Sequence, residues 1–519
     1  MPQIAGLPNG LKIGKRFRVS AVTPKMRGRT PRWLWVGAGG GALLALVALA
    51  TALAWTGILD FVLASQLALT PTSRSYREWV SPTVPLFFDI HFFNWTNADR
   101  FPDEKPALVQ LGPYRFREQR RHVNITWNNN ATLSYRTQRS WHFEAESSNG
   151  TLDDNITTLN VIAASAVYRS RFWGFLQQKG LSMGLSMFNQ QIAVSKLARE
   201  LLFEGYEDPL LDLAKSLPSS TTGGAPPVDK FGWFYERNNS LDTDGYMEIT
   251  SGQLSDTLPG QITRWNFEDH IPYYEGECSK LSGSAGEFMP RNLSEESILT
   301  MFVPDLCRTV NMDYVDSGEI DGLMYHKYAV SQESFDNSTL SQSNTCFCSG
   351  DCAWSGVMNV SACRYGSPAF ISLPHFLHGD ERLREFVDGM EPDPEAHSFY
   401  FAVEPKLGVP LDVSARFQLN IYLEPSPNVG LYQNVPRMLF PILWIEQKVQ
   451  VDKNICAELR FVRAISEWGG TVCACAALVF AALVTIATCW ARKPQYIKSE
   501  LLTPFEKPKD EAELKLNPI

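Results

Sequence analysis

Two long runs without a charged residue constrain this chain more than any other feature. The first covers residues 33–59, between Arg32 and Asp60, and the second covers residues 468–491. Each is long enough for a helix that crosses a bilayer, which needs roughly 20 residues. The first run is too long for the apolar region of a signal peptide, which has about 7–15 residues. The sequence therefore predicts two transmembrane helices, one near each end of the chain.

The charges beside these runs indicate how the chain is oriented in the membrane. Residues 1–32 carry eight basic side chains and no acidic one, and basic residues also follow the second run. By the positive-inside rule, such basic flanks stay in the cytoplasm. We therefore expect cytoplasmic tails at residues 1–32 and 492–519, with residues 60–467 forming one ectodomain on the extracellular or lumenal side. Cys489, at the cytoplasmic end of the second run, is a candidate for palmitoylation.

The segment between the runs has the composition of an acidic, glycosylated ectodomain. Of the chain's 47 basic and 56 acidic residues, 33 and 51 lie in this segment, which gives it a net charge of −18. That charge argues against binding to nucleic acid, which requires a basic face. Nine N-x-S/T sequons lie in the segment and none lies in the tails, a pattern that favours a glycosylated surface. The sequons are at Asn94, Asn124, Asn130, Asn149, Asn155, Asn238, Asn292, Asn337 and Asn359.

The cysteines of this segment also suggest an oxidising compartment. Six of the seven lie between residues 278 and 363. A zinc site would typically use CxxC pairs, whereas the tightest group here has the spacing CxCxxxC. We therefore expect disulfides, although spacing alone leaves the pairing open. Cys456 is the odd cysteine, either free or bridged to another chain.

Periodicity and turn residues predict an α+β fold, with a mostly β ectodomain and a helical insertion. Strands are expected at residues 86–95, 114–121, 399–403 and 417–423. The pattern changes near residue 158, where residues 159–178 and 192–203 are apolar at helical spacing. A further helix is expected at residues 294–302, because the residues near its start offer an N-cap and an acidic first turn.

The segment between the two expected helices, residues 179–188, is rich in large apolar side chains. These are Leu181, Met183, Leu185, Met187 and Phe188. They form either the core of the helical insertion or an exposed apolar patch for a partner or a lipid. A Gly-x-Ser-x-Gly match centred on Ser182 lies in the same segment. A hydrolase needs a strand before such a serine, and the preceding residues have helical spacing, so we do not expect catalysis there.

Two other polar groups are candidate binding sites. The densest basic cluster of the ectodomain consists of Arg115, Arg117, Arg120, Arg121 and His122. Such clusters are more often solvated than bound to an anion. A second group, which has metal-ligating residue types, consists of His375, His378, Asp380 and Glu381. Groups of this kind are usually surface polar residues, and we expect neither a metal nor a cofactor.

Eight short motifs occur in order along the chain. They are Phe93-Asn-Trp-Thr-Asn97, Leu111-Gly-Pro-Tyr114, Gly205-Tyr-Glu-Asp-Pro209, Asp305-Leu-Cys-Arg308, Cys346-Phe-Cys348, Ile371-Ser-Leu-Pro-His-Phe-Leu377, Asp388-Gly-Met-Glu-Pro392 and Pro441-Ile-Leu-Trp444. Together with the two apolar runs, they make residues 34–492 resemble the class B scavenger receptor family. That family includes the lysosomal integral membrane protein branch.

The resemblance implies a fold and a set of site residues. It implies an ectodomain with an antiparallel β-barrel-like core, an internal hydrophobic tunnel and an apical helical bundle at about residues 158–217. A family lysine contributes to ligand binding in this bundle, and Lys179 is the nearest match. The other ligand-binding candidates are Met183, Leu185, Met187 and Phe188. The disulfides implied by the family are Cys278–Cys346, Cys307–Cys363 and Cys348–Cys352.

The resemblance also implies a function without a catalytic step. Lipids or lipoproteins would bind at the apex, and fatty acid, cholesterol or cholesteryl ester would pass through the tunnel toward the membrane. The alternative is a lysosomal receptor that binds a protein partner through the apical helices. The C-terminal tail lacks an acidic dileucine signal, which favours the plasma membrane over a lysosomal or endosomal membrane. A homo-oligomer remains an open alternative to a monomer.

Overall fold

The computed structural model describes residues 32–216, 228–254, 258–338, 340–348 and 352–490. The chain divides into two compact units, which are described separately. One comprises residues 1–56 and 467–519, and the other comprises residues 57–466.

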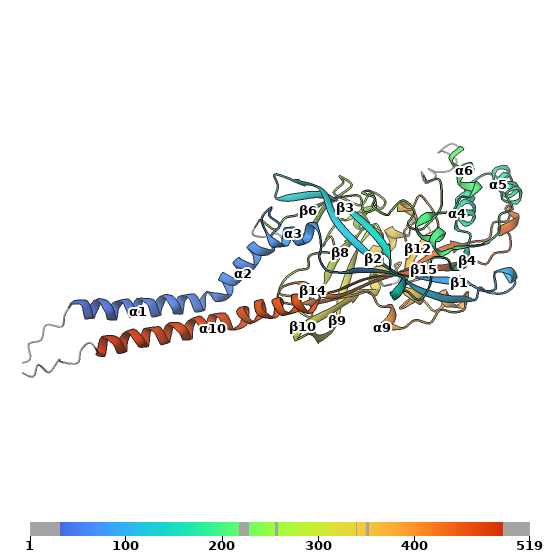
Figure 1. Ribbon diagram of the computed structural model, residues 1–519. Helices are drawn as coiled ribbons and strands as arrows, with labels where there is room; N and C mark the ends of the chain where they lie inside the picture. The colour runs from blue at the N-terminus through green and yellow to red at the C-terminus, as the bar shows by residue number, and fades with distance from the viewer. Residues whose placement is uncertain (1–31, 217–227, 255–257, 339, 349–351, 491–519) are drawn as a thin grey trace, which may run out of the picture. The chain divides into compact units, whose positions relative to one another are not determined.

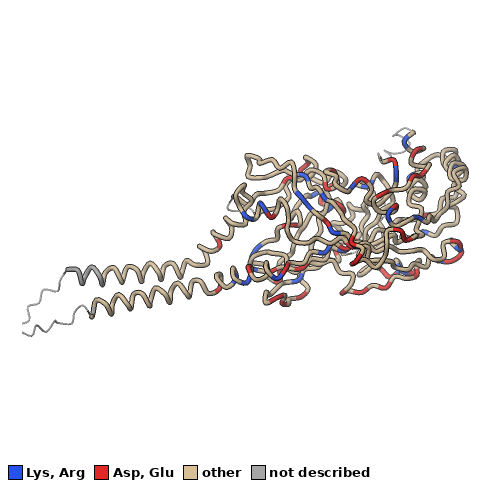
Figure 2. The backbone as a smooth tube through the Cα atoms, viewed as in Figure 1, with Lys and Arg blue, Asp and Glu red and all other residues tan. Residues whose placement is uncertain are grey.

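Three helices contain the two uncharged runs. They are α1 (Arg32–Leu53), α2 (Trp55–Leu67) and α10 (Lys453–Trp490). α10 is long and apolar enough to span a membrane, whereas α1 and α2 meet that condition only together and are bent by 60° at Ala54. The first run is therefore not one straight helix. Figure 2 shows α1 and the second half of α10 almost free of charged residues, in contrast to the unit of residues 57–466.

The unit of residues 57–466 is built on one large antiparallel sheet (Figure 1). Its strand order is β7-β6-β3-β2-β1-β15-β14-β13-β10-β9-β8, and β12, paired with β11, also joins β14. The strands are β1 (Leu86–Trp95), β2 (Leu108–Trp127), β3 (Thr132–Phe143), β6 (Tyr246–Thr250), β7 (Ile262–Trp265), β8 (Leu299–Val303), β9 (Arg308–Ile320), β10 (Leu323–Val330), β11 (Val357–Asn359), β12 (Ala369–Ser372), β13 (Tyr400–Glu404), β14 (Val409–Leu423) and β15 (Met438–Gln450).

A short segment joins the two ends of this sheet. The backbone N–H of Ile262 in β7 donates to the carbonyl of Gly283, and that of Ser284 donates to Thr300 in β8, both at 2.9 Å. The segment therefore satisfies backbone groups that would otherwise be exposed at both edge strands. The sheet is therefore nearly closed into a β-barrel-like core, which confirms the antiparallel core that the family resemblance implies.

The helical insertion lies at the end of the barrel remote from α3 (Arg74–Val80), as Figure 1 shows. It contains α4 (Val161–Ser170), α5 (Phe175–Met187), the π-helix η3 (Glu200–Glu204) and α6 (Pro209–Ser216). Asn160 caps α4, since its side chain accepts a hydrogen bond from the N–H of Ala163 at 3.1 Å. The shorter helices elsewhere are α8 (Arg382–Glu385) and α9 (Pro394–His397).

Eight short 3₁₀ segments complete the secondary structure of the described residues. They are η1 (Ala98–Arg100), η2 (Ala145–Ser147), η4 (Gly276–Ser279), η5 (Gln332–Phe335), η6 (Gln342–Phe347), η7 (Ser361–Cys363), η8 (Pro374–Phe376) and η9 (Gly430–Tyr432).

Four expectations about the secondary structure were wrong. Residues 159–178 are not one helix, because α4 ends at Ser170 and α5 begins at Phe175. Residues 192–203 are not one helix, because β5 (Ala193–Leu197) pairs with β4 (Asn155–Leu159) and η3 follows. Residues 294–302 are not a helix either, since β8 occupies the second half and pairs with β9. Residues 179–188 do not connect two helices, because residues 179–187 are the second part of α5. At residues 193–197 and 299–303, pairing with another strand outweighed local apolar spacing and capping residues.

Three disulfides join the loops around the barrel. They are Cys278–Cys346, Cys307–Cys363 and Cys348–Cys352, the pairs that the family resemblance implies. Cys456 is a free, buried cysteine. Cys489 is the palmitoylation candidate, and its side chain belongs to the part of the chain that the structure does not describe.

Candidate functional site

A cavity of about 440 Å³ lies between the inner face of the sheet and helices α4 and α6. Much of its wall is apolar. Strands β1, β14 and β15 contribute Phe88, Phe417, Leu419, Ile421, Leu443 and Ile445, and the two helices contribute Val161, Ile162, Leu210 and Leu211. Cavities of roughly 300–1,000 Å³ with mostly apolar walls and a few polar groups are typical of small-molecule sites.

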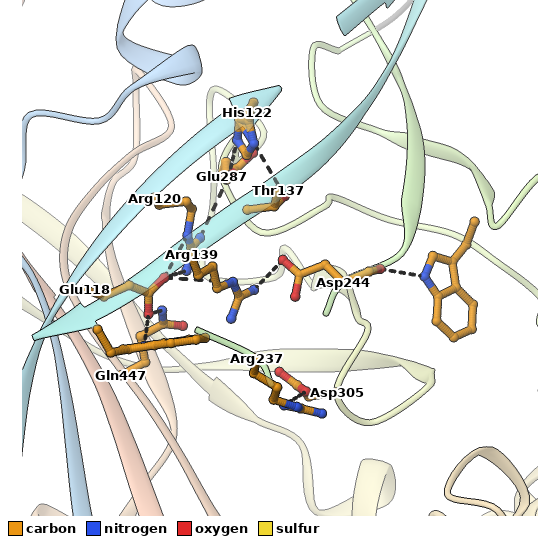
Figure 3. Close-up of polar contacts among 12 residues, drawn as sticks. Glu118, Arg120, His122, Thr137, Arg139, Arg237, Asp244, Glu287, Asp305 and Gln447 are labelled. Atoms are coloured by element: carbon orange, nitrogen blue, oxygen red, sulfur yellow. Dashed lines mark hydrogen bonds and ion pairs between the residues drawn. The ribbon is translucent and has the colours of Figure 1, made fainter. Parts of the chain in front are cut away.

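A polar network lies beside the cavity, on the inner faces of β2 and β3. Along β2, Phe116 is followed at alternate positions by Glu118, Arg120 and His122, all inside the barrel. In the register of the two strands, Arg120 lies directly opposite Arg139. Two like charges in that arrangement destabilise a sheet by themselves. Three carboxylates offset the repulsion, and Figure 3 shows them around the two arginines.

Glu118 is the most enclosed of these carboxylates, with a fully buried side chain. It accepts hydrogen bonds from Arg120 Nε at 3.0 Å and Nη2 at 2.9 Å, from Trp141 Nε1 at 3.3 Å and from Gln447 Nε2 at 2.9 Å. Burial disfavours its negative charge, but Arg120 and Arg139 outweigh burial and lower the pKa of Glu118. Glu118 therefore stays ionised and links β2, β3 and β15.

Glu287 closes the network on the side of α3. Its carboxylate accepts a hydrogen bond from Trp79 Nε1 at 2.7 Å and lies 2.9 Å from His122 Nε2. Burial, and then the charges of Arg120 and Arg139, lower the pKa of His122 to about 3. The contact between His122 and Glu287 is therefore a hydrogen bond of a neutral imidazole and not an ion pair.

Four charged side chains of this region line the cavity itself. Arg139 pairs with Asp244 at 2.7 Å, and Asp305 lies 3.1 Å from Arg237 and 3.6 Å from Arg364. Arg139, Arg237, Asp305 and Arg364 all belong to the wall of the cavity. Burial opposes the charge of Asp305, but Arg237, Arg139 and Arg364 lower its pKa to about 2. Charged groups are thus fixed in the wall of a mostly apolar chamber.

The site candidates from the sequence lie on α5, or directly after it in the case of Phe188, and not in the cavity wall. Lys179 is exposed, and its Nζ lies 5.7 Å from the centre of the Phe175 ring. Met183 and Met187 are 73% and 72% exposed, whereas Leu185 is buried and Phe188 is half-buried. The apolar side chains of this segment are therefore divided between the core and an exposed surface, and neither of the two interpretations of the segment describes all of them.

Ser182, His375 and the basic cluster already have structural partners. Ser182 lies inside α5, where its hydroxyl accepts a hydrogen bond from the N–H of Gly430 at 3.0 Å. His375 Nδ1 accepts from the N–H of Glu391, and its Nε2 lies 2.8 Å from Gln110 Oε1. No group of potential metal ligands occurs among the described residues.

The basic cluster is spread over both faces of β2, and four of its members contact carboxylates. The contacts are Arg115–Asp89, Arg117–Glu144, Arg120–Glu118 and His122–Glu287. The cluster therefore does not form a single anion site.

The charged residues in and beside the cavity were not predicted from the sequence. Arg237, which lines the cavity, and Asp244, which lies beside it, come from a loop region rich in turn residues, where no periodic pattern marks them. The one usable signal was the alternation on β2, since a strand with an apolar inner face does not normally place Glu and Arg at successive inward positions.

Comparison with known proteins finds matches along most of this chain. The model of the CD36 family matches residues 39–491. Protein peste of Drosophila melanogaster is 36% identical over 441 residues, which cover 84% of this chain and 78% of that protein. Scavenger receptor class B member 1 of Cricetulus griseus is 31% identical, with 80% and 81% covered. Lysosome membrane protein 2 of Homo sapiens is 30% identical, with 80% and 86% covered.

These matches define a membrane protein of the receptor class. The chain belongs to the CD36 family, and it is a class B scavenger receptor-like membrane protein. The resemblance inferred from the short motifs is thereby confirmed.

Proposed function

We propose that this protein binds a lipid in the cavity between the barrel and helices α4 and α6, and passes it toward the membrane. The observation that supports the proposal most is the apolar chamber of about 440 Å³ inside a disulfide-linked ectodomain. Both uncharged runs would cross the membrane, with the tails in the cytoplasm. A hydrophobic tunnel would extend this chamber toward the bilayer.

The physical reason for such a chamber is the cost of exposing hydrocarbon to water. Each CH₂ group buried is worth about 0.8 kcal/mol, so an acyl chain crosses water only at a large free-energy cost. An apolar chamber removes that cost without breaking or forming a covalent bond. The proposed activity is therefore transfer, and it requires no catalytic residue and no cofactor.

The apical helix α5 would make the first contact with the ligand. Lys179 lies on its exposed side, and Met183 and Met187 are exposed on the same helix. A cation beside exposed apolar side chains suits a lipid or lipoprotein surface that carries negative charge. Scavenger receptor class B member 1 is among the relatives, which supports a location at the plasma membrane.

A second candidate is a lysosomal receptor that binds a protein through α5. The observation in its favour is a group of strongly exposed apolar side chains on and before this helix. The group consists of Phe172, Phe175, Leu176, Met183 and Met187. Exposed apolar surface of this kind often marks a protein interaction site. Lysosome membrane protein 2 is also among the relatives.

Uptake by cells that express the chain distinguishes the two. The proposal expects surface staining of the ectodomain and uptake of a fluorescent lipid above that of control cells. Ala166→Trp should abolish the gain, because Ala166 lines the cavity and an indole would fill part of it. Ala396→Trp, at an exposed position of α9 away from the cavity, is the matched control and should retain uptake.

Lys179→Ala tests the apex in the same assay and should reduce uptake while surface expression is unchanged. Staining confined to acidic vesicles without any gain in uptake would contradict transfer at the plasma membrane. That result would favour the lysosomal receptor.

A further inference from the structure

We propose that Arg237, Asp305 and Arg364 form a headgroup subsite that binds the carboxylate of a long-chain fatty acid. This inference rests on the proposed function, since it specifies which lipid the cavity holds and in which direction it points. The subsite is the charged edge of the cavity and is separate from Lys179 on α5.

Asp305 is shared by two guanidinium groups. Its Oδ1 lies 3.1 Å from Arg237 Nη1 and 3.6 Å from Arg364 Nη2. One carboxylate thus neutralises one of two positive charges. Asp305 and Arg364 line the cavity and keep 39% and 34% of their side-chain surfaces accessible. An anion in the cavity can therefore reach the remaining charge.

The wall of the cavity as a whole also contains more basic than acidic side chains. Apart from Arg139 and Arg169, which interact with other groups, its basic side chains are Lys230, Arg237 and Arg364, and Asp305 is its single acidic side chain among the described residues. The charge of Arg139 is neutralised by Asp244, which does not line the cavity. The ectodomain as a whole has a net charge of −18. An excess of positive charge inside so acidic a domain indicates a ligand with negative charge.

The rest of the wall specifies what must be attached to that negative charge. Leu419, Ile421, Leu443 and Ile445 present apolar side chains from β14 and β15, and α4 contributes Ile162. A single acyl chain fits this surface while its carboxylate pairs with Arg237 and Arg364. Guanidinium and carboxylate groups form short, charge-assisted hydrogen bonds, often two at a time.

Neutral lipids have no charged group that can pair with Arg237 and Arg364. A cholesteryl ester would place hydrocarbon against the guanidinium groups and remove water from them without supplying a charged partner, which is unfavourable. The subsite therefore makes the cavity selective for the ionised fatty acid and orients it with the carboxylate at the loops of Asp305 and Arg237.

The test compares a long-chain fatty acid with its methyl ester, using the full chain in lipid nanodiscs at pH 7.4. The two probes have the same chain and differ in charge. We expect the acid to bind about tenfold more tightly or better, as expected for hydrogen bonds between charged groups in a cavity. Arg237→Gln and Arg364→Gln should each reduce this preference several-fold and leave binding of the ester unchanged.

Asp305→Asn should change the affinity for the acid in the opposite direction. It removes the carboxylate that competes with the ligand, so the acid should bind more tightly than to the unmodified protein, with the ester unchanged. A purely structural role for Asp305 predicts weaker binding of both probes. Arg136→Gln is the matched control, since Arg136 lies on β3 and pairs with the exposed Asp242 away from the cavity wall.

The outcomes separate this inference from the proposed function. If both probes bind equally well and the arginine variants change nothing, the subsite is refuted while the lipid cavity stands. If neither probe binds, the proposed function itself fails. Weaker binding of the acid to Asp305→Asn would also overturn the subsite.

Discussion

The imidazole of His91 stacks on the indole of Trp444, with ring centres 3.8 Å apart and planes inclined by 2°. His375 and His397 stack on each other nearby at 4.3 Å, and His397 meets Trp444 edge-on. Burial, and then the charges of the other two histidines, lower the pKa of His91 to about 3. Burial and His397 lower the pKa of His375 to about 4. The stack is therefore neutral in the folded protein.

This stack predicts that the protein loses stability on acidification. The folded pKa values lie below the unfolded value of 6.5, so the unfolded chain takes up protons first. Stability is complete above pH 6.5 and falls as the pH decreases toward 4, by about 2 kcal/mol per histidine at pH 5. His91→Phe keeps an aromatic ring and removes the titration, so it should reduce the difference in Tm between pH 7.4 and 5.0.

The control for this prediction is His142→Phe, which removes an exposed imidazole of β3 and should retain the difference seen in the unmodified protein. His91 Nδ1 has no hydrogen-bond partner, so the phenylalanine leaves no polar group unsatisfied. An unchanged pH dependence of Tm in His91→Phe would exclude the stack as its cause.

The ion pair of Arg139 and Asp244 predicts a large effect of removing one partner. Their side chains are only 15% and 6% exposed. Arg139→Met should lower the free energy of unfolding by about 3–5 kcal/mol, because it leaves a buried charge without a partner. The double variant Arg139→Met with Asp244→Leu should regain part of this loss, and denaturant unfolding in nanodiscs measures both.

Arg136 on the same strand is the matched comparison. It pairs with Asp242, whose side chain is 83% exposed. Arg136→Met should therefore cost less than about 1 kcal/mol. Equal losses in the two single variants would show that the burial of Arg139 does not determine the effect.

The disulfides should contribute unequally to stability. Cys278–Cys346 closes a sequence separation of 68 residues, and Cys348–Cys352 closes one of 4. Because the entropy of loop closure grows with loop length, removing the first pair should cost about 2.5 kcal/mol more than removing the second. The comparison needs both double serine variants, and a larger Tm loss for the pair at 348 and 352 would contradict it.

The nine sequons should not all carry glycans. Asn337 is buried, and its Nδ2 donates to the carbonyls of Ala353, Trp354 and Val357 at 2.9–3.3 Å. A glycan on Nδ2 would replace these bonds, so the mature protein should be unmodified there. Asn359 is buried as well. Glycopeptide mass spectrometry measures occupancy, and a glycan at Asn337 would contradict the burial of its side chain.

The remaining sequons provide the comparison within the same experiment. Six have exposed asparagines, at Asn124, Asn130, Asn149, Asn155, Asn238 and Asn292, and Asn94 is half-buried. We expect glycans at the exposed positions, because their side chains are accessible after folding.

Much of the architecture was predictable from local pattern. The strand expected at residues 86–95 is β1, and those at 399–403 and 417–423 fall in β13 and β14. The helix over residues 294–302 was wrong, because its capping residues resemble a helix start while residues 299–303 pair with β9. Local propensity is a weak prior where a neighbouring strand supplies hydrogen bonds.

The apolar runs, the acidic segment between them, its cysteines and the family motifs could all be read from the order of residues, since each depends on composition or on close neighbours. The cavity could not, because its wall combines segments that are far apart in the chain. Asp305 lies in a short motif, but its meeting with Arg237 and Arg364 follows from the closure of the barrel. Only folding brings two arginines to one carboxylate, and their combined charge inside an apolar wall is what makes the site.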